Sequence, residues 1–599
     1  MVCCVTFLIS LACSCGTRAT NQSAEITDIY AGDCLSDSGF CYRNIYSPTG
    51  LDAATSAELG LNNFDADWGI WGHNLKKTVD AENNEAFNAT VHGHKNSAQL
   101  CFSSQELYQR TVDYIVENFG EYQSIRIVIA PTDCPDACTC NNCTRLGNTA
   151  NSSTPAVTHF VEQLSKRFPV HKFFILSYLS TEQPPTHPLP QNVGVIISAM
   201  SLPFCLTDKE PNPHNRFVKQ LTQWRRVIKH LYVWDYINNF DDYLTPFPIL
   251  KVARLRLQYY KKQQVDGIFL NGSGYLYATF GDLKTAVLAG LLRNPNRSVE
   301  ALAKEFLKKA YPVSYKWIYN YYMLLEDQFP HNKPFHLYMG SNQLKQLYFS
   351  ASKFYDFYNG LNTFIEQSEG QERTNLQQLR TALSFPLLEM ARMYNMCPKA
   401  WIEGVKKDLY DAASVGTIQY YNEAEQTIHD YLTEWEQYMM PPSDISNNLL
   451  SGIMPKVMIH NDEDDIPACA ELLTLTDAVH GFPGNYHCGW VVFPAKSVDL
   501  NFSVNDITGS GTLKFSFLQM PRHHIFPPVE LEIYKNDVLY RTLPLVSYDK
   551  EVISSDGKSH MIKKSVPFSM DGVTRLTIRL IGSMKEREQM AVDEIAFVK

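Results

Sequence analysis

The chain lacks several features that would tie it to a familiar class of protein. Its 53 Lys and Arg residues and 63 Asp and Glu residues give a net charge of −10, and neither sign is gathered into long runs. Without a basic cluster the chain offers no surface suited to a phosphate backbone, so nucleic acids are excluded as partners. Internal repeats and low-complexity tracts are missing too. Because 599 residues exceed what one hydrophobic core organises, we expect two or three domains.

Long apolar runs are also missing, except for a short one at the start. The first residues, MVCCVTFLISLACSCG, are too few to span a bilayer and are typical of an export signal. Cys13 follows Leu11 and Ala12, which resembles the lipidation motif of bacterial lipoproteins, with Cys15 as the alternative acceptor. We therefore expect a leader over residues 1–22 and a lipoprotein of the outer membrane or cell surface, or alternatively a periplasmic or secreted protein. Any membrane contact is then made through the lipid anchor.

Cysteine is unevenly distributed along the chain. Four of the 15 cysteines lie in the leader, and the remaining 11 are an odd number, which excludes a wholly paired disulfide framework. Four others fall within ten residues: Cys134, Cys138, Cys140 and Cys143. Such spacing favours a shared structural zinc over the alternative, two local disulfides, because closely spaced thiolates chelate readily. A site closed by four sulfurs stiffens its loop and has no open position for catalysis.

Residues 100–310 alternate between short β-rich runs and amphipathic helical stretches. The predicted strands are 124–131, 172–178, 193–200, 230–236 and 266–272. Apolar strands that each lead into a helix indicate a parallel sheet covered on both faces. No glycine-rich phosphate loop follows a strand, which favours a barrel over an open sheet. The fold class is therefore α/β, with a TIM-type (β/α) barrel over residues 23–330.

The rest of the chain changes character twice. Residues 331–445 carry long helical patterns, which predict a helical bundle packed on the barrel. The stretch MMPPSDISNN has the Pro, Ser and Asn content of a linker. Alternating apolar and polar runs between turn residues then predict an antiparallel β-sandwich over residues 446–599.

Two aspartates stand where a barrel places its reactive groups, at the carboxyl ends of strands. Asp133 follows the run SIRIVIAPT, and Asp235 lies near the end of HLYVWDY. Glycoside cleavage needs one carboxyl group to protonate the leaving oxygen and a second carboxyl group to act as base or nucleophile, or to steady a substrate group that attacks. Both residues are therefore candidate catalytic groups. The alternative is that each caps a helix or holds a loop.

Aromatic and amide side chains gather near the same strand ends. Aromatic residues make up 12% of the chain, and the faces of their rings stack on the C–H surfaces of sugars. The candidate substrate contacts are Trp71, His73, Tyr178, Trp234, Tyr236, Asn239 and Asn271. Core packing is the alternative for the tryptophans. The expected ligand is an oligo- or polysaccharide, and catalysis on it needs no cofactor.

These motifs together resemble a glycoside-hydrolase-like bacterial family, domain of unknown function 4838, from about residue 41 to 330. The resemblance rests on five stretches, at residues 65–75, 97–104, 133–143, 231–250 and 266–274. It implies a relative of barrel glycosidases such as hexosaminidases and α-glucuronidases. Residues 474–493 and 517–534 are similar to a galactose-binding-like, discoidin-like sandwich, which binds sugar or acts as a spacer.

The chain departs from the family pattern at two positions. The resemblance implies Glu where this chain has Leu270 and an acidic residue near Ser201. We therefore keep two main hypotheses: a glycoside hydrolase acting on a complex glycan, and a catalytically inactive, lipid-anchored glycan-binding protein on the same scaffold. A third is an interaction protein that assembles with other surface proteins of glycan utilisation.

Overall fold

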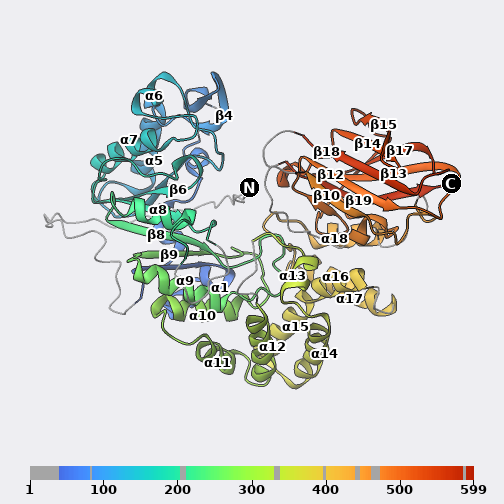
Figure 1. Ribbon diagram of the computed structural model, residues 1–599. Helices are drawn as coiled ribbons and strands as arrows, with labels where there is room; N and C mark the ends of the chain where they lie inside the picture. Colours follow the sequence, from blue (N-terminus) through green and yellow to red (C-terminus); the bar gives the residue numbers. More distant parts are fainter. Residues whose placement is uncertain are drawn as a thin grey trace. The chain divides into compact units, whose positions relative to one another are not determined.

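The computed structural model describes residues 39–80, 84–202, 211–329, 337–394, 399–438, 445–460, 472–583 and 588–599 (Figure 1). The leader, including Cys13, lies outside these ranges. The chain forms two compact units, one from residues up to 337 together with 362–375 and the other from 338–361 and 376–599. None of the helices in the described ranges has the length and apolar character needed to cross a membrane.

The first unit is built on a parallel sheet of seven strands. The strands are β1 (Tyr42–Tyr46), β2 (Trp68–Ile70), β5 (Arg126–Ile129), β6 (Lys172–Ser177), β7 (Val193–Ser198), β8 (His230–Tyr236) and β9 (Gly267–Asn271). Their order, β1-β9-β8-β7-β6-β5-β2, places the first strand beside the last, as in a barrel. Among the described residues no ladder joins β1 to β2. The prediction is thus confirmed in part: the fold is mixed α/β with a curled half-barrel rather than a closed barrel.

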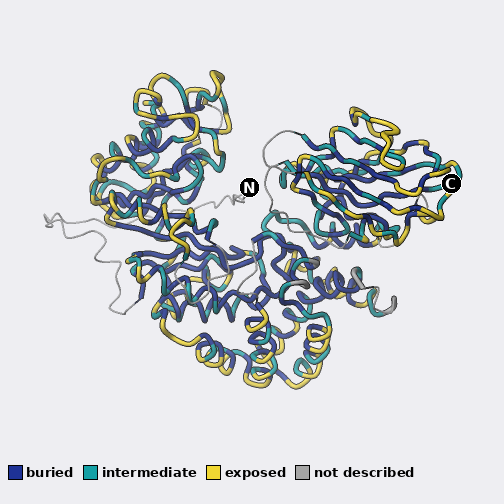
Figure 2. The backbone as a smooth tube through the Cα atoms, in the orientation of Figure 1, coloured by how far each residue is buried: buried dark blue, intermediate teal, exposed yellow. Residues whose placement is uncertain are grey.

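Burial explains why these segments form strands. Their Val, Ile, Phe and Leu residues are shielded on both faces, and Figure 2 shows the strands mostly in the dark blue of buried residues. Helices that alternate with the strands provide the cover: α5 (Gln105–Phe119), α7 (Thr154–Arg167), α8 (Arg216–Trp224), α9 (Leu250–Lys262) and α10 (Gly281–Arg293). Each fully buried apolar side chain contributes about 1.5–3 kcal/mol.

Aromatic rings fill the inside of the curled sheet. Tyr42 stacks on Tyr232 at 5.4 Å between ring centroids, and Phe174 lies 4.7 Å from Tyr232. The indole nitrogen of Trp68 on β2 donates to the hydroxyl of Tyr42 on β1 at 2.7 Å. A side-chain contact therefore spans the seam where β1 and β2 share no ladder.

A small hairpin is inserted between β2 and β5. It consists of β3 (Asn88–Val91) and β4 (His94–Leu100), which pair antiparallel. The loop after β5 runs against this hairpin and leads into the short helix α6 (Asn141–Leu146). The hairpin therefore holds that loop in place.

The helical bundle predicted over residues 331–445 is not confirmed. Helices α11 (Val299–Ala310) and α12 (Tyr315–Gln328) belong to the first unit, whereas α16 (Ser384–Tyr394), α17 (Lys399–Ser414) and α18 (Ile428–Tyr438) belong to the second. Helical periodicity in the sequence identified the helices but could not assign them to a core.

The C-terminal part of the second unit consists of two five-stranded antiparallel sheets, in agreement with the predicted β-sandwich. One has the order β10 (Lys456–His460), β12, β18, β14 (Glu530–Lys535) and β15 (Val538–Pro544), and the other has the order β11 (Val491–Phe493), β19, β13, β17 (His560–Ser569) and β16 (Lys550–Ile553). Central strands are β12 (Ser497–Ser503), β13 (Ser510–Gln519), β18 (Arg575–Ile581) and β19 (Met590–Val598). Phe515 and Phe517 from one sheet share a buried core with Leu576 and Ile578 from the other.

Candidate functional site

A pocket opens at the carboxyl ends of the parallel strands, the edge where (β/α) folds place their reactive groups. It encloses about 420 Å³ of space between atoms, including open solvent at its mouth. It is lined by His73, Asp133, Leu176, Tyr178, Ile196, Ser198, Met200, Trp234, Tyr236 and Asn271. Six of the predicted site residues therefore meet in one cavity: His73, Asp133, Tyr178, Trp234, Tyr236 and Asn271.

The second predicted carboxylate is not in this pocket. Successive side chains of a strand point to opposite faces, so Asp235 lies on the other face of β8 from Trp234 and Tyr236. Its carboxylate accepts from the Arg256 guanidinium at 2.5 Å and from the Tyr260 hydroxyl at 2.7 Å, both on α9. Asp235 is only 3% exposed. The expected convergence of Asp133 and Asp235 is therefore absent, and Asp235 joins the sheet to its covering helix.

Asp133 stands in the loop after β5 with its carboxyl group at the pocket wall. Burial raises the pKa of Asp133 above its usual value, although a hydrogen bond with Tyr178 opposes part of that shift. The direction favours the protonated acid at higher pH than an exposed aspartate would allow. Asp133 can therefore act as a proton donor inside the pocket.

His73 follows β2 and reaches the same space. Its Nδ1 lies 2.7 Å from the carbonyl oxygen of Pro131, and since a carbonyl can only accept, Nδ1 carries the hydrogen. Burial lowers the pKa of His73, which favours the neutral ring and leaves Nε2 as an acceptor. Its ring also lies 5.7 Å from that of Tyr178. The pocket thus combines an acid with a neutral imidazole.

Trp71 supports the pocket without lining it. Its ring stacks on Trp234 at 5.0 Å and 21°, and it also contacts Phe269 at 4.5 Å. The indole N–H of Trp234 is buried and has no hydrogen-bond partner among the described residues. A ligand oxygen could accept that hydrogen, which makes Trp234 the better candidate for a direct sugar contact.

The amides and hydroxyls predicted from the sequence divide in the same way. Asn271 ends β9 and lines the pocket, whereas Asn239 is 1% exposed in the loop after β8 and is absent from the pocket wall. The Tyr236 hydroxyl lies 3.0 Å from the hydroxyl of Ser198. Four lining residues were missed by the sequence reasoning: Leu176, Ile196, Ser198 and Met200. Strict alternation along β6 and β7 was the signal that could have found them.

The structure also explains one departure from the family pattern. Phe269 contacts Trp71 and Trp234 inside the half-barrel, and Asn271 lines the pocket. Leu270, between them, therefore faces the opposite side of β9, where it is 1% exposed. A glutamate at 270 would point away from this pocket. Ser201 lies next to the lining residue Met200, and its hydroxyl is buried with no partner among the described residues.

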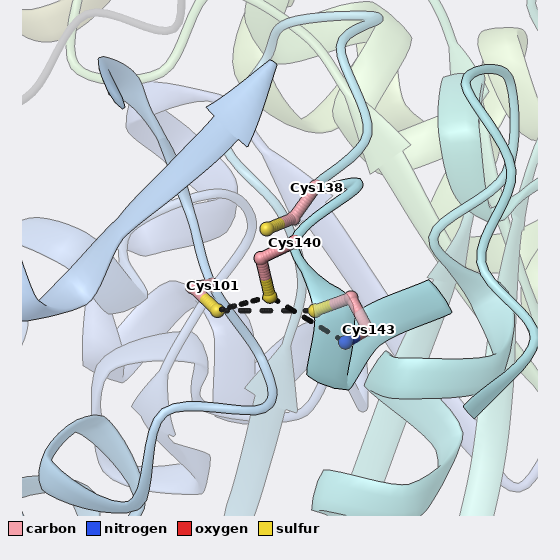
Figure 3. Close-up of side chains that lie close together, drawn as sticks. All are labelled: Cys101, Cys138, Cys140 and Cys143. Carbon is pink, nitrogen blue, oxygen red and sulfur yellow. Dashed lines mark hydrogen bonds between the residues drawn. The ribbon is translucent and has the colours of Figure 1, made fainter. Parts of the chain in front are cut away.

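Four thiols converge beside the loop that carries Asp133 (Figure 3). They belong to Cys101, Cys138, Cys140 and Cys143, and all four sulfurs lie within 4.8 Å of one another. This corrects the predicted ligand set, because Cys101 from the end of the hairpin takes the place of Cys134. Density of cysteines in the sequence could not reveal a partner 37 residues before Cys138. Burial of the Cys134 thiol, followed by the charges of Asp136 and Asp133, raises its pKa.

The sulfur positions suit a tetrahedral metal. Cys101 lies 3.7 Å from Cys140 and 3.8 Å from Cys143 between sulfurs. Zinc–sulfur bonds of about 2.3 Å at tetrahedral angles put the sulfurs about 3.8 Å apart. The backbone N–H of Thr90 donates to the sulfur of Cys138 at 3.2 Å, the kind of outer contact that steadies a ligand. All four thiols are free, whereas Cys41 is in a disulfide.

Comparison with known proteins gives a family and two distant structural likenesses. A GH115 4-O-methyl-α-glucuronidase, BtGH115A, with specificity for decorated arabinogalactans, is 10% identical with a TM-score of 0.32, over 82% of this chain and 66% of that one. This chain thus spans less than two thirds of its length. A GH138 enzyme targeting pectin rhamnogalacturonan II is 9% identical with a TM-score of 0.28, over 83% of this chain and 77% of that one. Curated proteins include no match.

The family comparison agrees with the resemblance seen in the sequence. The matching segment begins at β2 and ends within α12, so it contains every residue that lines the pocket and all four clustered thiols. Residues 69–322 match the model of a family described as domain of unknown function DUF4838.

Proposed function

We propose that this protein is a glycoside hydrolase that acts on a complex glycan, with Asp133 as the general acid. The proposal is carried by one observation: a carboxyl group whose burial favours its protonated form stands at the catalytic edge of a half-barrel, beside Trp234 and Tyr178. The acid donates its proton to the glycosidic oxygen as the bond to C1 breaks. Trp234 supplies a ring face and an unused N–H for the sugar.

A second protein carboxylate is not available to attack C1, because Asp133 is the sole carboxyl group among the described lining residues. In substrate-assisted hydrolysis a group of the substrate itself takes the place of the carboxylate nucleophile. We propose a 2-acetamido sugar: its carbonyl oxygen bonds to C1 while the glycosidic bond breaks and Asp133 protonates the leaving oxygen. Water then adds to C1, the acetamido oxygen departs, and the proton from water returns to Asp133.

The remaining lining residues suit this substrate. Nε2 of neutral His73 can accept the amide N–H, and Leu176, Ile196 and Met200 offer an apolar wall for the methyl group. Lys and Arg are absent from the described lining residues, so a uronate carboxylate would gain no ion pair here. The pocket therefore favours a hexosaminide over a glucuronide.

Asp133→Asn tests the assignment. Because the side-chain amide of Asn cannot donate the required proton, we expect kcat/KM on aryl 2-acetamido-2-deoxyhexosides to fall about 10²- to 10⁴-fold. The matched control is Asp506→Asn, an exposed residue of the sandwich, which should keep full activity. Both variants are first compared with the parent by circular dichroism. Full activity in Asp133→Asn would reject the role, and cleavage of glucuronides alone would reject the acetamido substrate.

A second candidate function is glycan binding without turnover, and the presence of one carboxyl group in the described pocket favours it. In that case calorimetry would detect binding of an oligosaccharide whose chromatogram stays unchanged after prolonged incubation. The Trp234→Ala variant should then lose binding, since it removes the ring face and the N–H together. Release of any product by the parent protein would rule this candidate out.

We also propose that Cys101, Cys138, Cys140 and Cys143 hold one structural zinc ion. When bound, zinc would cross-link the hairpin to the loop after β5, and the four thiolates would leave no position for substrate. Elemental analysis should find about one zinc per chain, falling at least fivefold in Cys101→Ser. Cys134→Ser is the control, because Cys134 lies outside the cluster, and it should keep its zinc. Equal loss in both variants would contradict the ligand set.

Export and lipid anchoring through Cys13 stay proposals that rest on the leader sequence. They imply an outer membrane or cell-surface protein that works beside other glycan-utilisation proteins, with the sandwich binding sugar or acting as a spacer. Replacing Cys13 by Ala should move the protein from the membrane to the soluble fraction, unless Cys15 is acylated instead. An unchanged fractionation in the double Cys13→Ala, Cys15→Ala variant would exclude the anchor.

A further inference from the structure

The loop that carries Asp133 has no helix or strand of its own between Pro131 and Cys140. Its shape must therefore be set by contacts with its neighbours, and the inserted hairpin supplies them. A catalytic group on a loop needs such support, because a displacement of about 1 Å can cost on the order of 10²-fold in rate. The question is which residues provide it.

Gln99, on β4 of the hairpin, holds the loop on both sides of Asp133. Its Oε1 accepts from the backbone N–H of Thr132 at 3.1 Å, just before Asp133. Its Nε2 donates to the carbonyl of Cys134 at 3.3 Å and to that of Asp136 at 3.2 Å, just after it. Gln99 is 2% exposed, so water does not readily replace these bonds. One side chain thus fixes the backbone that flanks the acid.

Further bonds tie the same two segments together. The Thr132 hydroxyl donates to the carbonyl of Ala98 at 2.6 Å. Farther along the loop, the backbone N–H of Thr139 donates to the carbonyl of Thr90 at 2.8 Å. The loop is therefore pinned at its beginning by β4 and near its end by β3.

The cysteine cluster closes the far end of this arrangement. Cys101 follows β4 directly, whereas Cys138 and Cys140 lie on the loop and Cys143 lies on α6. A metal held by these four sulfurs would join the end of the hairpin to the end of the loop. Gln99 and the metal would then hold the loop at two places, and the Gln99 hydrogen bonds lie on both sides of Asp133.

We infer that Gln99 and the four-cysteine metal site together form a clamp that positions the carboxyl group of Asp133, so that Gln99 is a positioning residue and metal occupancy sets the geometry of the pocket. This inference rests on the proposed role of Asp133 for its effect on catalysis. Its structural part, the fixing of residues 131–140, stands independently of any substrate.

Gln99→Met tests the first half of the clamp. Methionine keeps about the same volume and removes the three hydrogen bonds to the loop, and Gln99→Ala is the second variant should the longer side chain misfold. We expect amide hydrogen exchange to rise at least tenfold within residues 131–136 with zinc content unchanged. Exposed Gln105, which starts α5 outside the clamp, gives the control Gln105→Met. Unchanged exchange in both Gln99 variants would overturn the positioning role.

Kinetics of the same variants separate positioning from general stability. A misplaced acid lowers kcat, by about 10- to 100-fold here, while KM changes less than about threefold because the sugar contacts stay. Water entering a loosened loop would also reduce the burial of Asp133, and the alkaline limb of the pH profile should move to lower pH. A rise in exchange without any change in kcat or in that limb would refute the catalytic part.

Metal removal tests the second half. Treating the parent protein with a chelator, or introducing Cys101→Ser, should raise exchange across residues 131–143, and adding zinc back should reverse the chelator's effect. Cys134→Ser should exchange like the parent. Unchanged exchange after verified metal loss would overturn the clamp. If exchange rises as expected but no glycan is ever cleaved by the parent, the clamp stands and the proposed hydrolase function fails.

Discussion

At the scale of single residues, adjacent residues of β8 have different structural roles. Trp234 and Tyr236 line the pocket, whereas Asp235 between them forms a buried ion pair with Arg256 and accepts from Tyr260. A carboxylate at the end of a barrel strand is therefore insufficient as a sign of catalysis. The face to which it points decides its role, and that face follows from the parity of the position within the strand.

This placement gives a prediction for Asp235. Replacing it by Ala removes one partner of the buried ion pair with Arg256 and the acceptor of the Tyr260 hydroxyl, so unfolding free energy measured in urea should fall by about 3–5 kcal/mol. The double variant Asp235→Leu, Arg256→Met removes both charges and should recover most of that loss. The fraction of Asp235→Ala that stays folded should keep the kcat of the parent at temperatures well below its unfolding transition. A stable Asp235→Ala variant with kcat lowered 10²-fold would instead restore Asp235 as a catalytic candidate.

At the scale of elements, the sequence predicted what depends on local pattern. Runs such as VGVIISAM and HLYVWDY predicted β7 and β8 nearly to their ends, because apolar strands between amphipathic helices commonly form a parallel sheet that is buried on both faces. The same reasoning placed six pocket residues at one edge. It could not place the fourth thiol, since Cys101 reaches the cluster only through the hairpin β3–β4, whose inserted position depends on pairing between distant segments.

The open seam of the sheet could not be predicted from the sequence, for a related reason. Whether β1 and β2 share a ladder depends on the exact register of two short strands, and local pattern carries no information on it. Instead the aromatic contact of Tyr42 with Trp68 holds the seam. Glycines had a similar hidden role: a Cβ on Gly267 would come within 2.7 Å of the Tyr232 ring that stacks on Tyr42. Such requirements appear only when the packed rings are in place.

At the scale of the whole molecule, the second unit carries a buried acid that makes its stability depend on pH. Glu594 on β19 is 1% exposed, and burial, with the nearby Asp593 and Asp477, raises its pKa to about 10. Its carboxyl oxygens accept from the Asn448 side chain at 2.6 Å and from the backbone N–H of Ala478 at 3.2 Å. The neutral acid is thus built into the core of the sandwich.

The sign of the effect follows from proton linkage. The unfolded chain releases the Glu594 proton near its ordinary pKa of 4.5, whereas the folded unit keeps it up to about 10. The contribution of this group to stability is therefore fully present below pH 4.5 and is lost as pH rises toward 10, by up to about 1.4 kcal/mol per pH unit. Glu594→Gln keeps an uncharged side chain of the same shape and removes the titration. In scanning calorimetry between pH 6 and 9, the unfolding transition of the second unit should move to lower temperature with rising pH in the parent and move much less in Glu594→Gln. The transition of the first unit is the control and should shift equally in both proteins. Equal shifts of the second unit in the two proteins would show that Glu594 is already ionised in the folded state.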